Sequence, residues 1–431
     1  MTITLLGRER AELKIGFILI TVFLAAILIY PLYSVLNQSF FVDGAFSLSN
    51  FSRYLTDSRF FAVLGNSFKA SFTVAAIATT LAFFCAYGLN FCRYRDSVKQ
   101  GISMVILLPL FLPSITYGFA IIYSFGRQGL ITKLFGQLPF SIYGFNGLVI
   151  AGVIYTLPPA FMILNNAFKY VDRNFVIVSK VMGDSALRSF YMTGLRPVMG
   201  AMISAFILCF FLNFTDFGIP ASIGGRYEVI ATKLYAVMMG AVPDFANGSV
   251  IAISMLVPSI VSVLILSWSD RLNFRYNKIS PTPPQPNRIR DWAFMAYFAA
   301  VALLILSTFA VMFVVPFVKS YPYQLWFTTD TITRILSDGA VFGAYKNSLY
   351  VAVLSAALGT VICYFAGLIN ARSNLNGFAK TTLDAFAMIA NTVPGMVLGI
   401  GFLLALFRPS VDFQGGQKGT SFRTSLSIAG A

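Results

Sequence analysis

The sequence predicts an all-α, polytopic transmembrane helical bundle, and three observations support that prediction. Of the 431 residues, 57% are hydrophobic and only 11% are charged. Soluble domains carry about 25% charged residues, so this chain has too few charges to cover a water-facing surface of its size. Nine apolar stretches are also long enough to cross a bilayer core, which takes roughly 20 helical residues. Finally, the basic residues concentrate in alternate connecting segments.

The predicted spans follow one another with polar connections between them. The first is interpreted as a retained helix, because no small-residue cleavage site follows it. If the N-terminus is cytoplasmic, the inside segments hold 18 of the 31 Lys and Arg residues, at about twice the density of the outside segments, as the positive-inside rule requires. The nine predicted spans are 15–36, 70–91, 102–125, 147–168, 198–217, 248–268, 292–318, 350–370 and 385–407.

Several classes of function lack the residues that they need. The chain has no histidine, which removes acid–base chemistry and metal binding by that side chain. Its four cysteines are scattered without metal-ligand spacing, and no GxxxxGK phosphate loop occurs. We therefore expect no enzyme activity, no catalytic residues, and no metal or cofactor bound by this chain. The positive charge follows the topology, so no nucleic-acid partner is expected.

The chain contains an internal repeat. Asn66-Ser67 recurs as Asn347-Ser348, and Pro113 recurs as Pro394, with the same offset for both pairs. The repeat predicts two units that insert with the same orientation. The polar tail is interpreted as a truncated or frame-shifted end, with a natural short tail as the alternative. The predicted units are a first six-span unit at 1–268 with a long loop at 169–197, a basic Pro-rich linker at 269–291, a partial three-span second unit at 292–409, and the tail at 410–431.

The long loop has the pattern of two short helices around a turn. Residues 183–185 read Gly-Asp-Ser, in which Gly can end one helix and Asp or Ser can cap the next. Pro197 suits the start of the following span, because the first turn of a helix needs no backbone donor there. We expect a short helix across the cytoplasmic end of the bundle. The side chains that it would present to a partner are Met182, Leu187 and Phe190.

This loop resembles the conserved cytoplasmic loop of the inner-membrane permeases of binding-protein-dependent ABC importers. That family's pattern is Glu-Ala-Ala, three residues, Gly, an apolar position and a closing Leu-Pro. Gly183, Phe190 and Leu195 match it, whereas residues 177–179 read Ile-Val-Ser and the proline is one place late. The resemblance implies contact with an ATPase. The residues that it assigns to this contact are Ser179, Met182, Gly183, Asp184, Ser185, Leu187, Phe190, Leu195 and Pro197.

The wider pattern, including Thr-Asp-Phe-Gly-Ile-Pro at 215–220, is similar to the fused, double-length permeases of iron(III), polyamine and 2-aminoethylphosphonate importers. The stretch 126–144 favours a phosphonate cargo over iron(III) or polyamine. The resemblance implies a multi-pass protein of the bacterial inner (plasma) membrane, with a cytoplasmic N-terminus. It also implies two partners besides the bilayer: a dimer of ABC ATP-binding subunits, which would hold ATP and magnesium, and a periplasmic or extracellular solute-binding protein.

Four residues are candidates for the translocation path: Asn213, Asp216, Pro113 and Pro394. Asp216 could instead cap the helix that follows it, and prolines are common in membrane helices in any case. The alternative functions are an ion-coupled secondary transporter or channel, or an inactive truncated permease remnant. An ion-coupled transporter would be expected to carry buried ionisable pairs within its spans, and only Asp216 and Asp384 lie near span ends.

Overall fold

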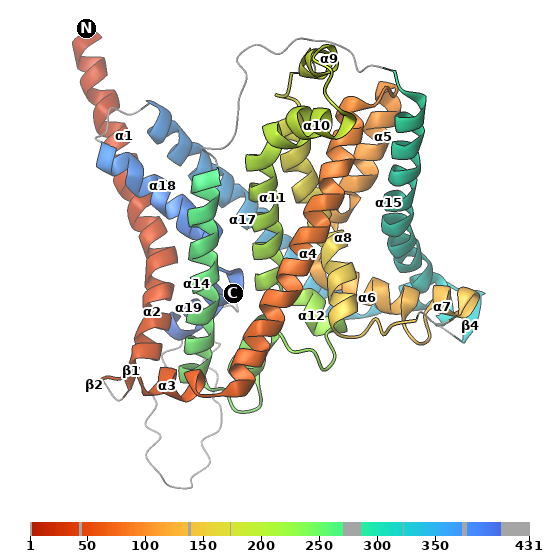
Figure 1. The fold of residues 1–431 in the computed structure, drawn as a ribbon. Coiled ribbons are helices and arrows are strands. Elements are labelled where there is room, and N and C mark those ends of the chain that lie inside the picture. Colours follow the sequence, from red (N-terminus) through yellow and green to blue (C-terminus); the bar gives the residue numbers. More distant parts are fainter. Residues whose placement is uncertain are drawn as a thin grey trace.

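The computed structural model describes residues 2–42, 45–136, 139–172, 174–269, 286–321, 323–372 and 377–406. The central part of the predicted linker (270–285) and the tail (410–431) lie outside these ranges. The described chain is almost entirely helical, with two short antiparallel hairpins (Figure 1). The structure confirms the prediction of an all-α chain with many helices that are long and apolar enough to span a membrane.

The helices divide into two groups along the chain. The first group is α1 (Thr2–Leu24), α2 (Tyr30–Phe40), α3 (Ser49–Leu55), α4 (Ser58–Phe91), α5 (Asp96–Leu107), α6 (Ser114–Phe125), α7 (Leu130–Phe135), α8 (Phe145–Phe168), α9 (Asn174–Val181), α10 (Ala186–Phe190), α11 (Met199–Thr215), α12 (Gly218–Ile223), α13 (Ile230–Met239) and α14 (Phe245–Ser269). The second is α15 (Arg288–Val314), α16 (Asp330–Ser337), α17 (Gly339–Arg372), α18 (Gly377–Thr392) and α19 (Gly395–Leu406). The hairpins pair β1 (Phe41–Val42) with β2 (Ala45–Phe46), and β3 (Val318–Ser320) with β4 (Gln324–Phe327).

The described residues contain seven helices that are long and apolar enough to cross a membrane, or eight spans if one bent pair counts. The prediction of nine spans is therefore wrong at two places. The predicted span 102–125 bends by 105° between two helices, and 385–407 is divided between α18 and α19. Each break lies at a proline, Pro113 or Pro394, because proline lacks the backbone donor and clashes with the preceding turn of a helix.

The helix boundaries repeat along the chain. Helices α4 and α17 have the same length of 34 residues, and their first residues are separated by the same offset as Asn66 and Asn347. Helices α18 and α19 begin at that offset from α5 and α6. We call α1–α14 the first repeat and α15–α19 the second repeat.

The first helices of the two repeats are exchanged. Helix α15 of the second repeat packs against α5 and α6 of the first, whereas α2 of the first repeat packs against α19 of the second. Since α19 is the equivalent of α6, the contact of α2 with α19 corresponds to the contact of α15 with α6. Figure 1 shows α2 beside α19 on one side of the molecule and α15 beside α5 on the other. Each repeat is therefore packed against a helix supplied by the other.

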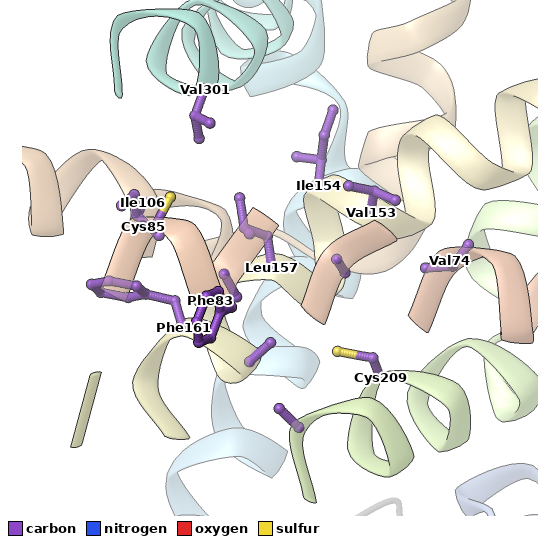
Figure 2. Packing of buried hydrophobic residues seen from close by; sticks show 14 of the residues in the cluster. Val74, Phe83, Cys85, Ile106, Val153, Ile154, Leu157, Phe161, Cys209 and Val301 are labelled. Carbon is purple, nitrogen blue, oxygen red and sulfur yellow. The ribbon is translucent and has the colours of Figure 1, made fainter. Parts of the chain in front are cut away.

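The largest apolar core among the described residues forms where α4, α8 and α11 of the first repeat pack together, and α15 of the second repeat adds Phe298, Val301, Ile305 and Phe309 to it. Phe83 of α4, Phe161 of α8 and Cys209 of α11 are among its buried side chains (Figure 2). Alanines on α4 let the neighbouring helices approach closely, as small residues do between membrane helices. By contrast, Ile369 is the one residue of α17 that is buried within the described chain.

Candidate functional site

The 174–197 loop forms one end of the bundle. As predicted, it consists of two short helices, α9 and α10, on either side of a turn (Figure 1). Helix α10 is not separate from the span that follows. It continues through a π turn (Tyr191–Leu195) and a 3-10 turn (Arg196–Val198) into α11, so that Ala186–Thr215 is one helical segment of 30 residues. Pro197 lies in the 3-10 turn, close to the predicted start of the span.

The turn between the helices depends on the backbone of Gly183. Its φ angle is +77°, in the left-handed region, which costs a residue with a Cβ atom about 1–2 kcal/mol. No other atom lies within 4 Å of the position that a Cβ atom would take. The backbone angle, rather than a lack of space, therefore favours glycine here.

Hydrogen bonds hold the turn from both sides. The Ser179 hydroxyl donates to Asp184 Oδ2 at 2.8 Å, and the Asp184 amide donates to the Ser179 carbonyl at 3.1 Å. Asp184 Oδ1 also lies 3.1 Å from Arg188 Nε, and the Ser185 hydroxyl accepts from the Arg188 amide at 3.4 Å as the N-cap of α10. Asp184 thus links the end of α9 to the first turn of α10.

The exposed apolar residues of the loop differ from those expected, and they include Val181, which is 83% exposed. Met182 is 75% exposed and Leu187 is 82% exposed. Phe190, by contrast, packs edge-to-face against Phe83 and Tyr87 of α4, with ring centroids 6.0 and 5.3 Å apart. Phe190 is therefore half-buried, and its ring packs against the bundle instead of standing free at the surface as predicted. The ring turns inward because α10 continues into the span at this point, and Leu195 likewise packs against the core.

A groove of about 370 Å³ lies between α9 and the segment that begins with α10. Its walls combine apolar side chains with two arginines and Asp184. Sequence reasoning did not single out several of these residues, because they are adjacent only after the loop folds back on itself. The principal lining residues are Phe175, Val178, Met182, Met192, Arg188 and Arg196.

Two of the four predicted path residues, Asn213 and Asp216, lie at the other end of α11. Asn213 and Asp216 both line a cavity of about 20 Å³, which is room for roughly one water molecule. The Asn213 side chain donates to the Cys209 carbonyl at 3.0 Å. Pro113 lies next to Ser114, which hydrogen-bonds Asp216, whereas Pro394 occupies the equivalent break in the second repeat.

Asp216 acts as a helix cap. Its Oδ2 atom accepts from the Ile219 amide at 2.8 Å, at the start of α12. Burial raises the pKa of Asp216, and hydrogen bonds from Ser114 and from the backbone oppose that rise. These contacts agree with the capping role that was the alternative for this residue.

Substitution of Asp216 distinguishes the two roles. Asparagine caps a helix about as well as aspartate, whereas alanine costs about 1 kcal/mol. If Asp216 is a cap, Asp216→Asn should keep the thermal-unfolding midpoint and the transport rate of the unmodified protein, and Asp216→Ala should lower the midpoint. A path residue that needs its charge would differ in transport: Asp216→Asn would lose uptake although its midpoint stays that of the unmodified protein.

Comparison with known proteins places the loop within a recognised region. Residues 78–278 match the family described as binding-protein-dependent transport system inner membrane component. The chain is 24% identical over 396 residues to the putative ferric transport system permease protein FbpB 1 of Haemophilus influenzae, covering 88% of this chain and 61% of that protein. It is 27% identical over 368 residues to the thiamine transport system permease protein ThiP of Salmonella typhimurium, covering 81% and 65%.

Among solved structures, a chain of a bacterial alginate ABC transporter, crystallised with an alginate-bound periplasmic protein, aligns at a TM-score of 0.48 and 12% identity. The alignment covers 63% of this chain and 97% of that one. The chain spans about three-fifths of the length of the curated ferric permeases that it matches.

Proposed function

Because residues 78–278 match the inner membrane component of binding-protein-dependent transport systems, we propose that this chain is a permease subunit of an ATP-driven ABC importer. The observation that carries the proposal is that the matched region contains the whole 174–197 loop. Within it, Met182 and Leu187 are exposed on either side of a turn that hydrogen bonds hold in shape. Such a surface suits a protein partner, since exposed apolar side chains beside charged ones are typical of interfaces.

In this proposal the chain forms the path for the solute and performs no chemistry itself. A dimer of separate ATPase subunits holds ATP and magnesium and contacts the loop from the cytoplasm, which makes the N-terminus cytoplasmic as well. A solute-binding protein delivers cargo at the opposite end. Since α10 and α11 form one continuous helical segment, displacement of the loop moves the span as one piece, in the manner of a rigid-body switch.

The ATPase contact is tested with Leu187→Asp. Burial of a leucine contributes about 1.5–3 kcal/mol, so we expect the affinity for the ATPase subunits to fall about tenfold or more. The measurement is titration of purified ATPase against the chain in nanodiscs. Ile289→Asp is the matched control: Ile289 is 86% exposed and lies at the start of α15, at the same end of the bundle (Figure 1). Equal affinities for Leu187→Asp and the unmodified chain would contradict the proposal.

For the cargo we propose iron(III), and the expectation of a phosphonate has no support among these relatives. FbpB 1 is named as a ferric permease and aligns with 88% of this chain. Thiamine is the second candidate, because ThiP aligns with 81%. Uptake of labelled iron(III), thiamine and 2-aminoethylphosphonate into proteoliposomes, with the matching binding proteins and ATPase, decides among them. Uptake of thiamine or the phosphonate without iron(III) would reject the iron assignment and leave the importer assignment intact.

A further inference from the structure

We propose that Tyr87 is the positioning residue that links the 174–197 loop to α15, so that movement of the loop is transmitted to the first helix of the second repeat. The inference rests on the proposed function, in which the loop contacts an ATPase. The link is an aromatic junction, which we define as Tyr87 of α4, Phe190 of the loop, and Phe294 and Phe298 of α15.

On the loop side, Tyr87 contacts both a ring and the backbone. The centroids of the Tyr87 and Phe190 rings are 5.3 Å apart, in an edge-to-face arrangement. A Cβ atom at Gly194, in the buried part of the π turn, would lie 2.9 Å from Tyr87 Cε2. The tyrosine ring therefore lies directly on the turn that joins α10 to α11. Short π segments of this kind are frequent at functional sites.

On the other side, the same part of α4 contacts α15. The Tyr87 and Phe294 ring centroids are 5.6 Å apart, and a Cβ atom at Gly88 would lie 2.5 Å from Phe294 Cδ1 and 2.8 Å from Phe298 Cζ. Two further tyrosines fix α15 along its axis: Tyr297 donates to the Leu81 carbonyl at 2.9 Å, and Tyr94 donates to the Asp291 carbonyl. The contact between α4 and α15 is therefore as close as the contact between α4 and the loop.

Tyr87 thus has the loop on one side and a helix of the other repeat on the other. Protein interiors are close-packed and transmit displacement rather than absorb it. A shift of the π turn therefore presses on the tyrosine ring, and through it on Phe294. Because α15 opens the second repeat, a single ATPase contact in the first repeat would move helices of both repeats.

The equivalent position in the second repeat lacks this link. At the offset that relates α4 to α17, the residues equivalent to Tyr87 and Gly88 are Leu368 and Ile369. Ile369 is buried, and a Cβ atom at Gly16 of α1 would lie 3.5 Å from its Cδ1 atom. Here the glycine lies on α1, the exchanged helix, and the large Ile369 lies on α17. In the first repeat the glycine lies on α4 instead, and the large Phe294 lies on the exchanged helix α15. The two repeats therefore differ at this position in which helix carries the large side chain.

The link can be measured without any transport activity. Spin labels are placed at Leu187→Cys and Ile289→Cys, both more than 80% exposed, in a Cys363→Ser background, since the other three cysteines are buried. Interspin distances are recorded for the whole chain in nanodiscs. We expect a narrow distribution with Tyr87 or Tyr87→Phe, and a distribution at least twice as broad with Tyr87→Ala. Phe61→Ala, half-exposed on the same helix, is the control and should stay narrow. An unchanged distribution for Tyr87→Ala would overturn the proposal.

A second measurement tests transmission itself. With ATPase and binding protein present, Tyr87→Ala should slow uptake by roughly two- to thirtyfold, the range found for residues that couple distant sites. Its affinity for the ATPase should stay within twofold of the unmodified chain, and Tyr87→Phe should transport normally. A parallel tenfold loss of ATPase affinity would overturn the proposal, because Tyr87 would then only shape the loop. If the unmodified chain binds no ATPase, the proposed function fails, whereas the spin-label result still decides whether the link exists.

Discussion

Gly183→Val should lower uptake at least about tenfold while the protein still inserts into the membrane. Valine at φ +77° is strained by about 1–2 kcal/mol or more, because left-handed angles suit glycine and are poorest for β-branched residues. A strain of about 1.4 kcal/mol corresponds to a factor of ten in the population of the native turn. The turn would relax to another conformation, separating Ser179 from Asp184 and displacing α10 from its place beside α9.

Gly183→Asn is the control for this substitution. Asparagine adds a side chain but tolerates the left-handed region, and the space beside residue 183 is open. We therefore expect Gly183→Asn to retain most of the uptake and of the ATPase affinity. Both variants are compared with the unmodified chain for membrane insertion, ATPase binding and uptake in proteoliposomes. If valine and asparagine had the same effect, the backbone angle would not be the reason for glycine at this position.

Gly401→Leu should destabilise the protein by about 1–3 kcal/mol, the usual cost of overpacking a tight contact. A Cβ atom at Gly401 of α19 would lie 2.6 Å from the carbonyl oxygen of Pro31 and 2.8 Å from its Cβ atom. The obstacle is largely backbone, which cannot rotate out of the way as a flexible side chain can. Leucine would therefore force α2 away from α19 and break one of the two exchanged contacts.

Gly399→Leu provides the matched control, because it lies on the same helix and has no atom within 4 Å of the Cβ position. Leucine there should be neutral or stabilising by up to about 1 kcal/mol, since glycine is a poor helix former. The thermal-unfolding midpoint in detergent should fall for Gly401→Leu and stay level or rise for Gly399→Leu. Equal midpoints for the two variants would show that α2 and α19 are not packed as described.

Local features of the site were predictable from the sequence because their causes are local. The turn at Gly183 and the cap at Ser185 depend on one backbone angle and one side-chain acceptor. The direction of Phe190 was not predictable in this way. A ring at that position can face a partner or the bundle, and the choice depends on Phe83 and Tyr87, which lie far earlier in the chain.

The sequence by itself determined the class of the protein, because length and apolarity are what a bilayer requires of a helix. It also contained a repeated pattern of residues, and the starts of α4 and α17, of α5 and α18, and of α6 and α19 are separated by the same offset. Only the tertiary structure decided that α2 and α15 are exchanged between the repeats, and that one helix ends before Pro113 and another before Pro394, with a new helix after each. The reason is physical: one apolar helix face resembles another, so hydrophobicity specifies that a helix is buried but not which helix it packs against. That choice rests on close contacts such as Gly401 on Pro31 and Gly88 on Phe294.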